Sequence, residues 1–150
     1  MIALASPPPI RVAFVRAPHA TLHLAVANDD RRGALYCGDD VAPDGTDGRI
    51  TMYPADMALP LGGTSTSESR DVALVAASGR VVAVTSYALP SNVSGGPARS
   101  YTQVFARYVV ELPAGRAYRE GIVAGSTLQI PALAPVERPI LSPPCHRDIR

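Results

Sequence analysis

Short apolar runs, each bounded by glycine, proline or small polar residues, constrain this chain more than any other feature of its sequence. Several runs alternate between apolar and polar residues, as where Leu22, Leu24 and Val26 share one face. No run is both long and periodic enough to predict an extended amphipathic helix. The pattern therefore predicts short β-strands. They are expected at residues 10–15, 21–27, 49–53, 72–77, 81–86, 103–112 and 127–130.

Turn residues connect these runs at close spacing. Gly79, with its neighbours Ser78 and Arg80, predicts a β-hairpin between the fourth and fifth runs. Residues 30–36 and 115–120 can each form a helical turn, the second of which ends at Gly121. The predicted fold class is mainly β (a β-rich α+β fold). It is a compact small β-barrel or sandwich of about seven short strands, with one or two short helical turns.

Prolines divide the chain into three parts. Consecutive prolines fix φ and remove backbone donors, so both ends are predicted to be extended arms. The parts are a proline-rich N-terminal arm at 1–9, a single β-rich domain at 10–130 and a proline-rich C-terminal arm at 131–150. Such arms are either solvated tails or straps laid on another subunit. If they are straps, the residues expected to contact a partner are Pro7, Pro8, Pro9, Pro139, Pro143, Pro144, Arg147 and Arg150.

Composition excludes several classes of function. The formal net charge is +1, which gives no electrostatic case for nucleic acid or an anionic membrane. All basic residues other than histidine are arginine, so chemistry that needs a lysine is not available. No apolar run approaches the roughly 18 residues of a membrane span. The start, MIALASPPPIRVAF, lacks the basic region of a secretory signal, so we expect synthesis in the cytoplasm without export.

The stretch YVVELPAGRAYREGIVAGSTLQI, residues 108–130, resembles the closing segment of the domain-of-unknown-function 192 family. That segment has a Val-Leu-Glu-Leu-x-Ala-Gly strand and turn, then Gly-Ile-x-x-Gly-Asp before a last strand. The residues that fit are Glu111, Ala114, Gly115, Gly121, Ile122 and Gly125, while Ser126 replaces the aspartate. Upstream, AVANDDRRGALY and RDVALVAASGRVVAV resemble the family's earlier steps. Its Trp-Met-Lys-Asn-Thr element is GGTSTSESRD here, and only Thr66 and Asp71 fit. The resemblance implies a fold rather than an activity.

No catalytic or metal-binding constellation is expected. Gly-x-Ser-x-Gly is absent, and the histidines lie in no pattern that would serve as a base. A zinc site would need most of the soft ligands together, and they lack ligand spacing. Those residues are His19, His23, Cys37, Cys145 and His146. The aspartates of residues 38–48 lack the alternate order of a calcium loop. We therefore expect no metal and no cofactor.

The one candidate ligand site lies around residues 64–71. Its expected ligand-binding residues are Thr66, Asp71 and Glu111, which would line a concave polar site. Asp71 is expected to bond its own polar loop, and Glu111 to pair with Arg107 or Arg119. A catalytic carboxylate pair of Asp71 with Glu111 is the alternative.

Two functions from different classes follow. The first is a non-enzymatic interaction module of a larger assembly, held by its terminal arms to other protein subunits, either copies of itself or a capsid protein. Its concrete form is a bacteriophage capsid decoration protein, made in the cytoplasm and incorporated into a virion. The alternative is a small bacterial domain that binds a polar ligand, or acts as a hydrolase, at residues 64–71.

Overall fold

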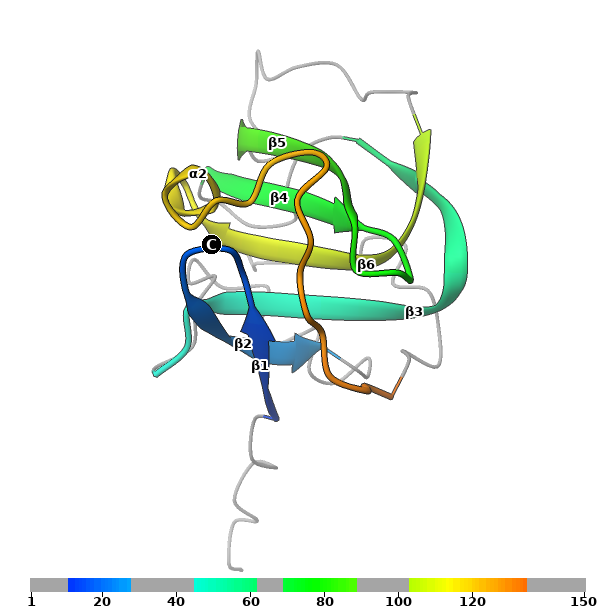
Figure 1. Cartoon of the computed structure of the whole chain (residues 1–150). Helices are drawn as coiled ribbons and strands as arrows, with labels where there is room; N and C mark the ends of the chain where they lie inside the picture. The colour runs from blue at the N-terminus through cyan, green and yellow to red at the C-terminus, as the bar shows by residue number, and fades with distance from the viewer. Residues whose placement is uncertain (1–10, 28–44, 62–68, 89–102, 135–150) are drawn as a thin grey trace, which may run out of the picture.

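The strands of the described structure belong to one mixed β-sheet, with one short helix beside it. The computed structural model describes residues 11–27, 45–61, 69–88 and 103–134, and Figure 1 draws the rest as a thin grey trace. The strands are β1 Val12–Arg16, β2 Thr21–Ala27, β3 Gly48–Pro60, β4 Arg70–Val75, β5 Val81–Ala88 and β6 Gln103–Pro113. Helix α2, Arg116–Arg119, follows β6. The strand order is β1-β2-β3-β6-β4-β5; β2 and β3 are parallel, and the other neighbours are antiparallel.

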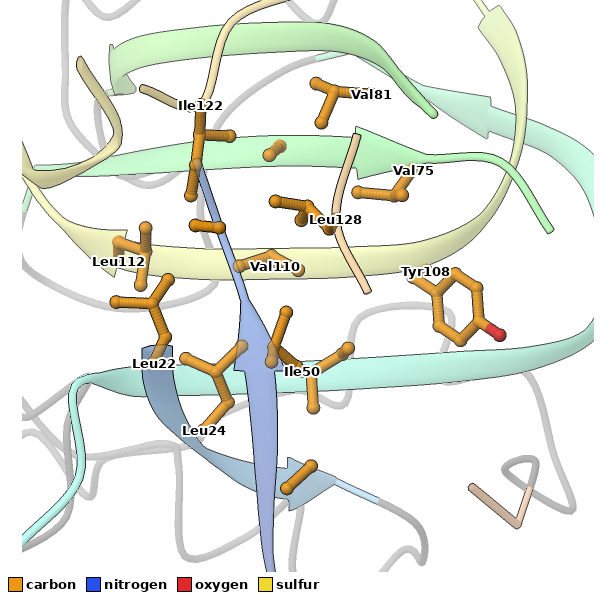
Figure 2. Packing of buried hydrophobic residues seen from close by; sticks show 14 of the residues in the cluster. Leu22, Leu24, Ile50, Val75, Val81, Tyr108, Val110, Leu112, Ile122 and Leu128 are labelled. Atoms are coloured by element: carbon orange, nitrogen blue, oxygen red, sulfur yellow. The ribbon is translucent and has the colours of Figure 1, made fainter. Parts of the chain in front are cut away.

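The main hydrophobic core lies on one face of this sheet. Alternate residues of the strands point into it, and Leu24, Ile50, Val75 and Val110 are completely buried there. Figure 2 shows these side chains gathered with Leu128, which comes from the segment after α2. Each aliphatic side chain buried in this way contributes about 1.5–3 kcal/mol to folding. The core therefore holds the sheet and the later segment together.

The segment after α2 crosses the sheet and joins its two edge strands. Thr127 forms an antiparallel bridge with Arg80, next to β5, and Gln129 forms one with Arg16, at the end of β1. Between them the amide of Leu128 donates to the carbonyl oxygen of Gly79 at 2.8 Å. Figure 1 shows this crossing segment in orange, running from β5 towards β1. The sheet is thus partly closed around its core.

The predicted hairpin is present, and its glycine has two roles. Gly79 has φ of 90°, which a residue with a side chain adopts only at a cost. A Cβ atom at Gly79 would also collide with the carbonyl oxygen of Leu128. Glycine therefore makes the turn and lets the crossing segment approach it.

The mainly β fold class is confirmed, and two predicted boundaries are wrong. Pro54 was expected to end a strand, but β3 continues through it to Pro60. The register with β6 shifts between Met52 and Met57, so Pro54 lies in the break and its missing N–H interrupts no ladder. Residues 127–130 form bridges instead of a full strand. In this register Pro131 would oppose Phe14, and proline has no N–H to continue the ladder.

The remaining predictions about the ends lie largely outside the described residues. This holds for residues 1–9, for 135–150 and for the helical turn at 30–36. Leu133, within the predicted C-terminal arm, packs against the main core, so the folded domain extends at least that far. The described residues include no helix long and apolar enough to cross a membrane.

Candidate functional site

A charged cluster lies on the sheet face opposite to the main core. Glu111 alternates along β6 with the core residues Val110 and Leu112, so its side chain points to the other face. Arg49 is its direct neighbour on β3, and Arg70 lies diagonally across from it on β4. Glu111 Oε2 is 2.6 Å from Arg49 Nη2 and 3.6 Å from Arg70 Nη1. One carboxylate thus lies between guanidinium groups of two neighbouring strands.

Burial makes this cluster energetically important. The side chain of Arg70 is 1% exposed, and those of Arg49 and Glu111 are close to 10%. Removing charges from water costs several kcal/mol per ion, and only close opposite charges and hydrogen bonds offset that cost. The three side chains are therefore coupled. A change to one alters the environment of the other two.

Tyr53 borders the cluster on β3. Burial raises the pKa of its hydroxyl, the negative charge of Glu111 raises that pKa further, and Arg49 opposes the shift. Arg107 Nε donates to the carbonyl oxygen of Tyr53 at 3.1 Å, which ties β6 to this part of β3. The phenol is therefore a neutral polar group at physiological pH.

Asp71 lies on the core side of the sheet and holds α2. Its Oδ2 accepts a hydrogen bond from the amide of Ala117 at 2.9 Å, in the first turn of that helix. Gly115, with φ of 88°, turns the chain from β6 into α2. Gly121, with φ of 76°, follows the helix, as the sequence predicted. Asp71 therefore has a structural role in joining β4 to α2.

A second group of charges also holds α2. Asp47 Oδ1 is 3.2 Å from Arg116 Nη2, and Asp47 Oδ2 accepts from the amide of His23 at 2.8 Å. Glu120 Oε1 lies 3.0 Å from Arg116 Nε and 3.4 Å from Arg119 Nε. These contacts connect α2 to β2 and to the residues before β3.

The structure separates the predicted site residues. Asp71 shares a face with Leu112 and Glu111 shares the opposite face with Val72, so the two acids cannot form a carboxylate pair. Glu111 pairs with arginines of β3 and β4, and the expected pairing with Arg107 or Arg119 is wrong. Thr66 lies outside the described residues.

The soft ligands do not gather in the part of the chain that the structure describes. His19 Nδ1 is 3.2 Å from the carbonyl oxygen of Arg119, and the ring of His23 meets Phe14 edge-to-face, with centroids 4.7 Å apart. Cys37, Cys145 and His146 lie outside that part. Among its residues, no group of three or more His, Cys, Asp or Glu side chains could hold a metal.

Sequence reasoning missed Arg49 and Arg70 as partners of Glu111. Both occupy positions that alternate with core residues, so their location on the far face could have been inferred. Their proximity to Glu111 depends on β6 lying between β3 and β4. Nothing in the sequence gives that order.

Several large apolar side chains are exposed. Phe14 is 61% exposed on β1, an edge strand of the sheet, and Val12 of the same strand is also exposed. Phe105 on β6 and Tyr118 on α2 are more exposed still, the latter at 81%. Aromatic residues are enriched at protein–protein interfaces, and single exposed apolar side chains are also common on the surfaces of monomers.

The comparisons with known proteins show the fold alone. No family model matches the chain, and no curated protein does. A solved structure from Sinorhizobium meliloti 1021, described as a "putative transcription regulator", is similar with a TM-score of 0.61 and 18% identity. The similarity covers 83% of this chain and 98% of that one. A protein of unknown function from Novosphingobium aromaticivorans gives a TM-score of 0.54 and 17% identity, over 85% of this chain and 93% of that one. The chain thus shares its fold with both structures.

Proposed function

We propose that this chain is a non-catalytic interaction module of a larger assembly, with a bacteriophage capsid decoration protein as its concrete form. The observation that carries the proposal is the exposed aromatic residue on β1. Phe14 and Val12 stand on a strand at the edge of the sheet, close along the chain to the prolines of residues 7–9. A partner that covers this strand would bury apolar surface and could extend along the chain towards the prolines of residues 7–9.

The described structure also supports the idea that the domain is a rigid support. The crossing segment joins the two sheet edges, and the charged side chains of Asp71 and Glu111 are engaged within the fold. A surface held by a rigid fold orders fewer side chains and loops on docking, so less of its interaction energy is lost.

The experiment compares assembly of the full chain with that of shortened and substituted variants. Because Leu133 packs against the core, the C-terminal deletion begins at residue 135 and the N-terminal one removes residues 1–9. Sedimentation and light scattering report self-association, and crosslinking in the native particle reports neighbouring chains. We expect the double deletion and Phe14→Ser each to reduce association. Unchanged association and no crosslinks from either end would refute the proposal.

A second function has one observation in its favour. The Arg49–Glu111–Arg70 cluster includes Arg70, which lies within residues 64–71, the stretch that the alternative hypothesis assigns to a polar-ligand site. Such a site would use these three side chains and not Asp71, which faces α2. Thermal-shift screening of small carboxylates and phosphates tests it. A ligand whose stabilisation is lost in Arg49→Met would favour this function.

The family assignment is likewise a proposal. Gly115, Gly121 and Gly125, which match the closing motif of the domain-of-unknown-function 192 family, all have positive φ, where glycine is strongly preferred. Ile122 of the same motif is buried in the main core. The motif residues thus have structural roles in this fold, and the assignment to that family stays a proposal.

A further inference from the structure

The outer face of the crossing segment carries an ordered set of polar side chains. Arg16 is bridged to Gln129 and Arg80 to Thr127, and residues paired across a ladder point to the same face. Leu128, between them, is only 2% exposed because it points inward, whereas all four paired residues are exposed. We call these four residues, Arg16, Gln129, Thr127 and Arg80, the arginine row.

Positive charge predominates among the exposed side chains that the structure describes. The exposed charged residues in the described parts of the chain are four arginines and one aspartate: Arg11, Arg16, Arg80, Arg119 and Asp56. The described acids other than Asp56 are buried or half-buried, and each bonds a partner within the fold. Asp56 itself accepts from the amide of Ala77 at 2.9 Å, in the hairpin turn that precedes Arg80. Among the described residues, the ion pairs involve other arginines, and neither Arg16 nor Arg80 forms one with an acid.

Helix α2 extends this surface at one end. The turn that begins after Arg16 places His19 against α2, where its amide donates to the carbonyl oxygen of Glu120 at 3.2 Å. The neighbouring residues Tyr118 and Arg119 are exposed, Tyr118 at 81% and the Arg119 side chain at 69%. Tyrosine and arginine are the residue types that most often dominate binding energy at protein interfaces.

We propose that the arginine row docks an acidic, extended segment of a partner protein. This inference rests on the proposed interaction function and specifies the chemistry of the partner. Arg16 and Arg80 are separated by two strand spacings and two residues along the crossing segment, so their Cα atoms lie about 12 Å apart. Carboxylates four residues apart in an extended chain are about 13 Å apart, which matches this separation. Thr127 and Gln129 lie between the arginines and can hydrogen-bond the backbone of the bound segment.

An acidic peptide fits this surface better than nucleic acid does. The formal net charge of the whole chain is +1, so long-range attraction of a polyphosphate is weak. A short acidic segment needs only the local charge of the row, and the exposed tyrosine of α2 offers an apolar contact to its side chains.

The test measures binding of a fluorescein-labelled peptide that has glutamate at every fourth position and serine or glycine elsewhere. Fluorescence anisotropy at low ionic strength compares it with the same peptide carrying glutamine, and with an oligothymidylate of equal charge. We expect the full chain to bind the glutamate peptide at least about tenfold more tightly than either control probe. Binding should weaken as salt is added, because the contacts are exposed ion pairs.

Charge reversal of the row provides the residue-level test. Arg16→Glu combined with Arg80→Glu should weaken binding at least about tenfold, and the neutral Arg16→Gln/Arg80→Gln pair should weaken it less. Arg11→Glu is the matched control, because Arg11 is also an exposed arginine but lies about 17 Å along the chain from Arg16. Far-UV circular dichroism confirms that each variant is folded.

Three results would overturn the inference. The first is that the glutamate and glutamine peptides bind equally tightly. The second is that Arg11→Glu weakens binding as much as the Arg16→Glu/Arg80→Glu pair does. The third is that oligothymidylate binds as tightly as the glutamate peptide. If the glutamate peptide fails to bind while the arm deletions still abolish association, only this inference fails. If association is also unaffected by the deletions, the proposed function fails with it.

Discussion

Replacing Glu111 by glutamine tests the account of the buried charged cluster. The change keeps the shape of the side chain but removes the charge that lies 2.6 Å from Arg49 and 3.6 Å from Arg70. At an effective dielectric constant of about 20, an ion pair at about 4 Å is worth about 4 kcal/mol before desolvation is counted. Removing one partner of a buried pair typically costs about 3–5 kcal/mol, since the remaining charge stays buried. We therefore expect Glu111→Gln to lower the free energy of unfolding by about 3–5 kcal/mol.

Urea unfolding followed by far-UV circular dichroism measures this loss, because the chain has no tryptophan to serve as a fluorescence probe. For a chain of this length the same loss lowers Tm by about 6–20 °C. The control is Asp56→Asn, an exposed side chain that keeps its acceptor for Ala77, and it should change stability by less than about 0.5 kcal/mol.

A second variant separates burial of charge from loss of packing. The triple variant Arg49→Leu/Arg70→Met/Glu111→Leu removes all three charges and keeps side chains of similar volume. Buried ion pairs replaced in this way are often neutral or stabilising. The triple variant should therefore be more stable than Glu111→Gln. A loss below about 1 kcal/mol in Glu111→Gln, or a triple variant less stable than it, would refute the reasoning.

Three further predictions concern the pH response and the closure of the sheet. The pKa of Tyr53 is raised in the folded state, so its stabilising contribution is complete below the unfolded pKa of about 10 and is lost as pH rises through the higher folded value. As pH rises above about 10, the free energy of unfolding of Tyr53→Phe should therefore fall less than that of the unsubstituted chain, as measured by urea unfolding at each pH. Gly79→Ala should destabilise more than Gly125→Ala; both glycines have φ near 90°, but only the Cβ atom at Gly79 meets the crossing segment. Leu128→Ala should cost about 2–5 kcal/mol by thermal unfolding, and a cost below about 1 kcal/mol would mean that the crossing segment is not part of the core.

Local features of the fold were predictable because they depend on neighbouring residues. Alternation in residues 21–27 predicted β2 with its full length, and the run after Gly79 predicted β5. The glycines on either side of α2 marked that helix, since each supplies a positive φ that other residues avoid. In these places the local sequence is sufficient to predict the local conformation.

Long-range features were not predictable in the same way. The parallel pairing of β2 with β3, and the position of β6 between β3 and β4, depend on which strands bury the most surface together. Glu111 could be placed on a strand from its sequence, but its partners followed only from that order. Asp71 looked like a loop residue because it follows a polar run, yet its carboxylate reaches α2.

The bridge between Arg16 and Gln129 also has a consequence for synthesis of the chain. The two residues lie near opposite ends of the described sequence. Almost the entire domain must therefore be synthesised before the crossing segment can pair with the end of β1. Until then the edges at β1 and β5 are open templates for strand pairing with other nascent chains. A domain whose sheet edges are joined by so late a segment is therefore most exposed to aggregation on the ribosome, and its yield in cells should respond strongly to chaperones that cover unpaired strands.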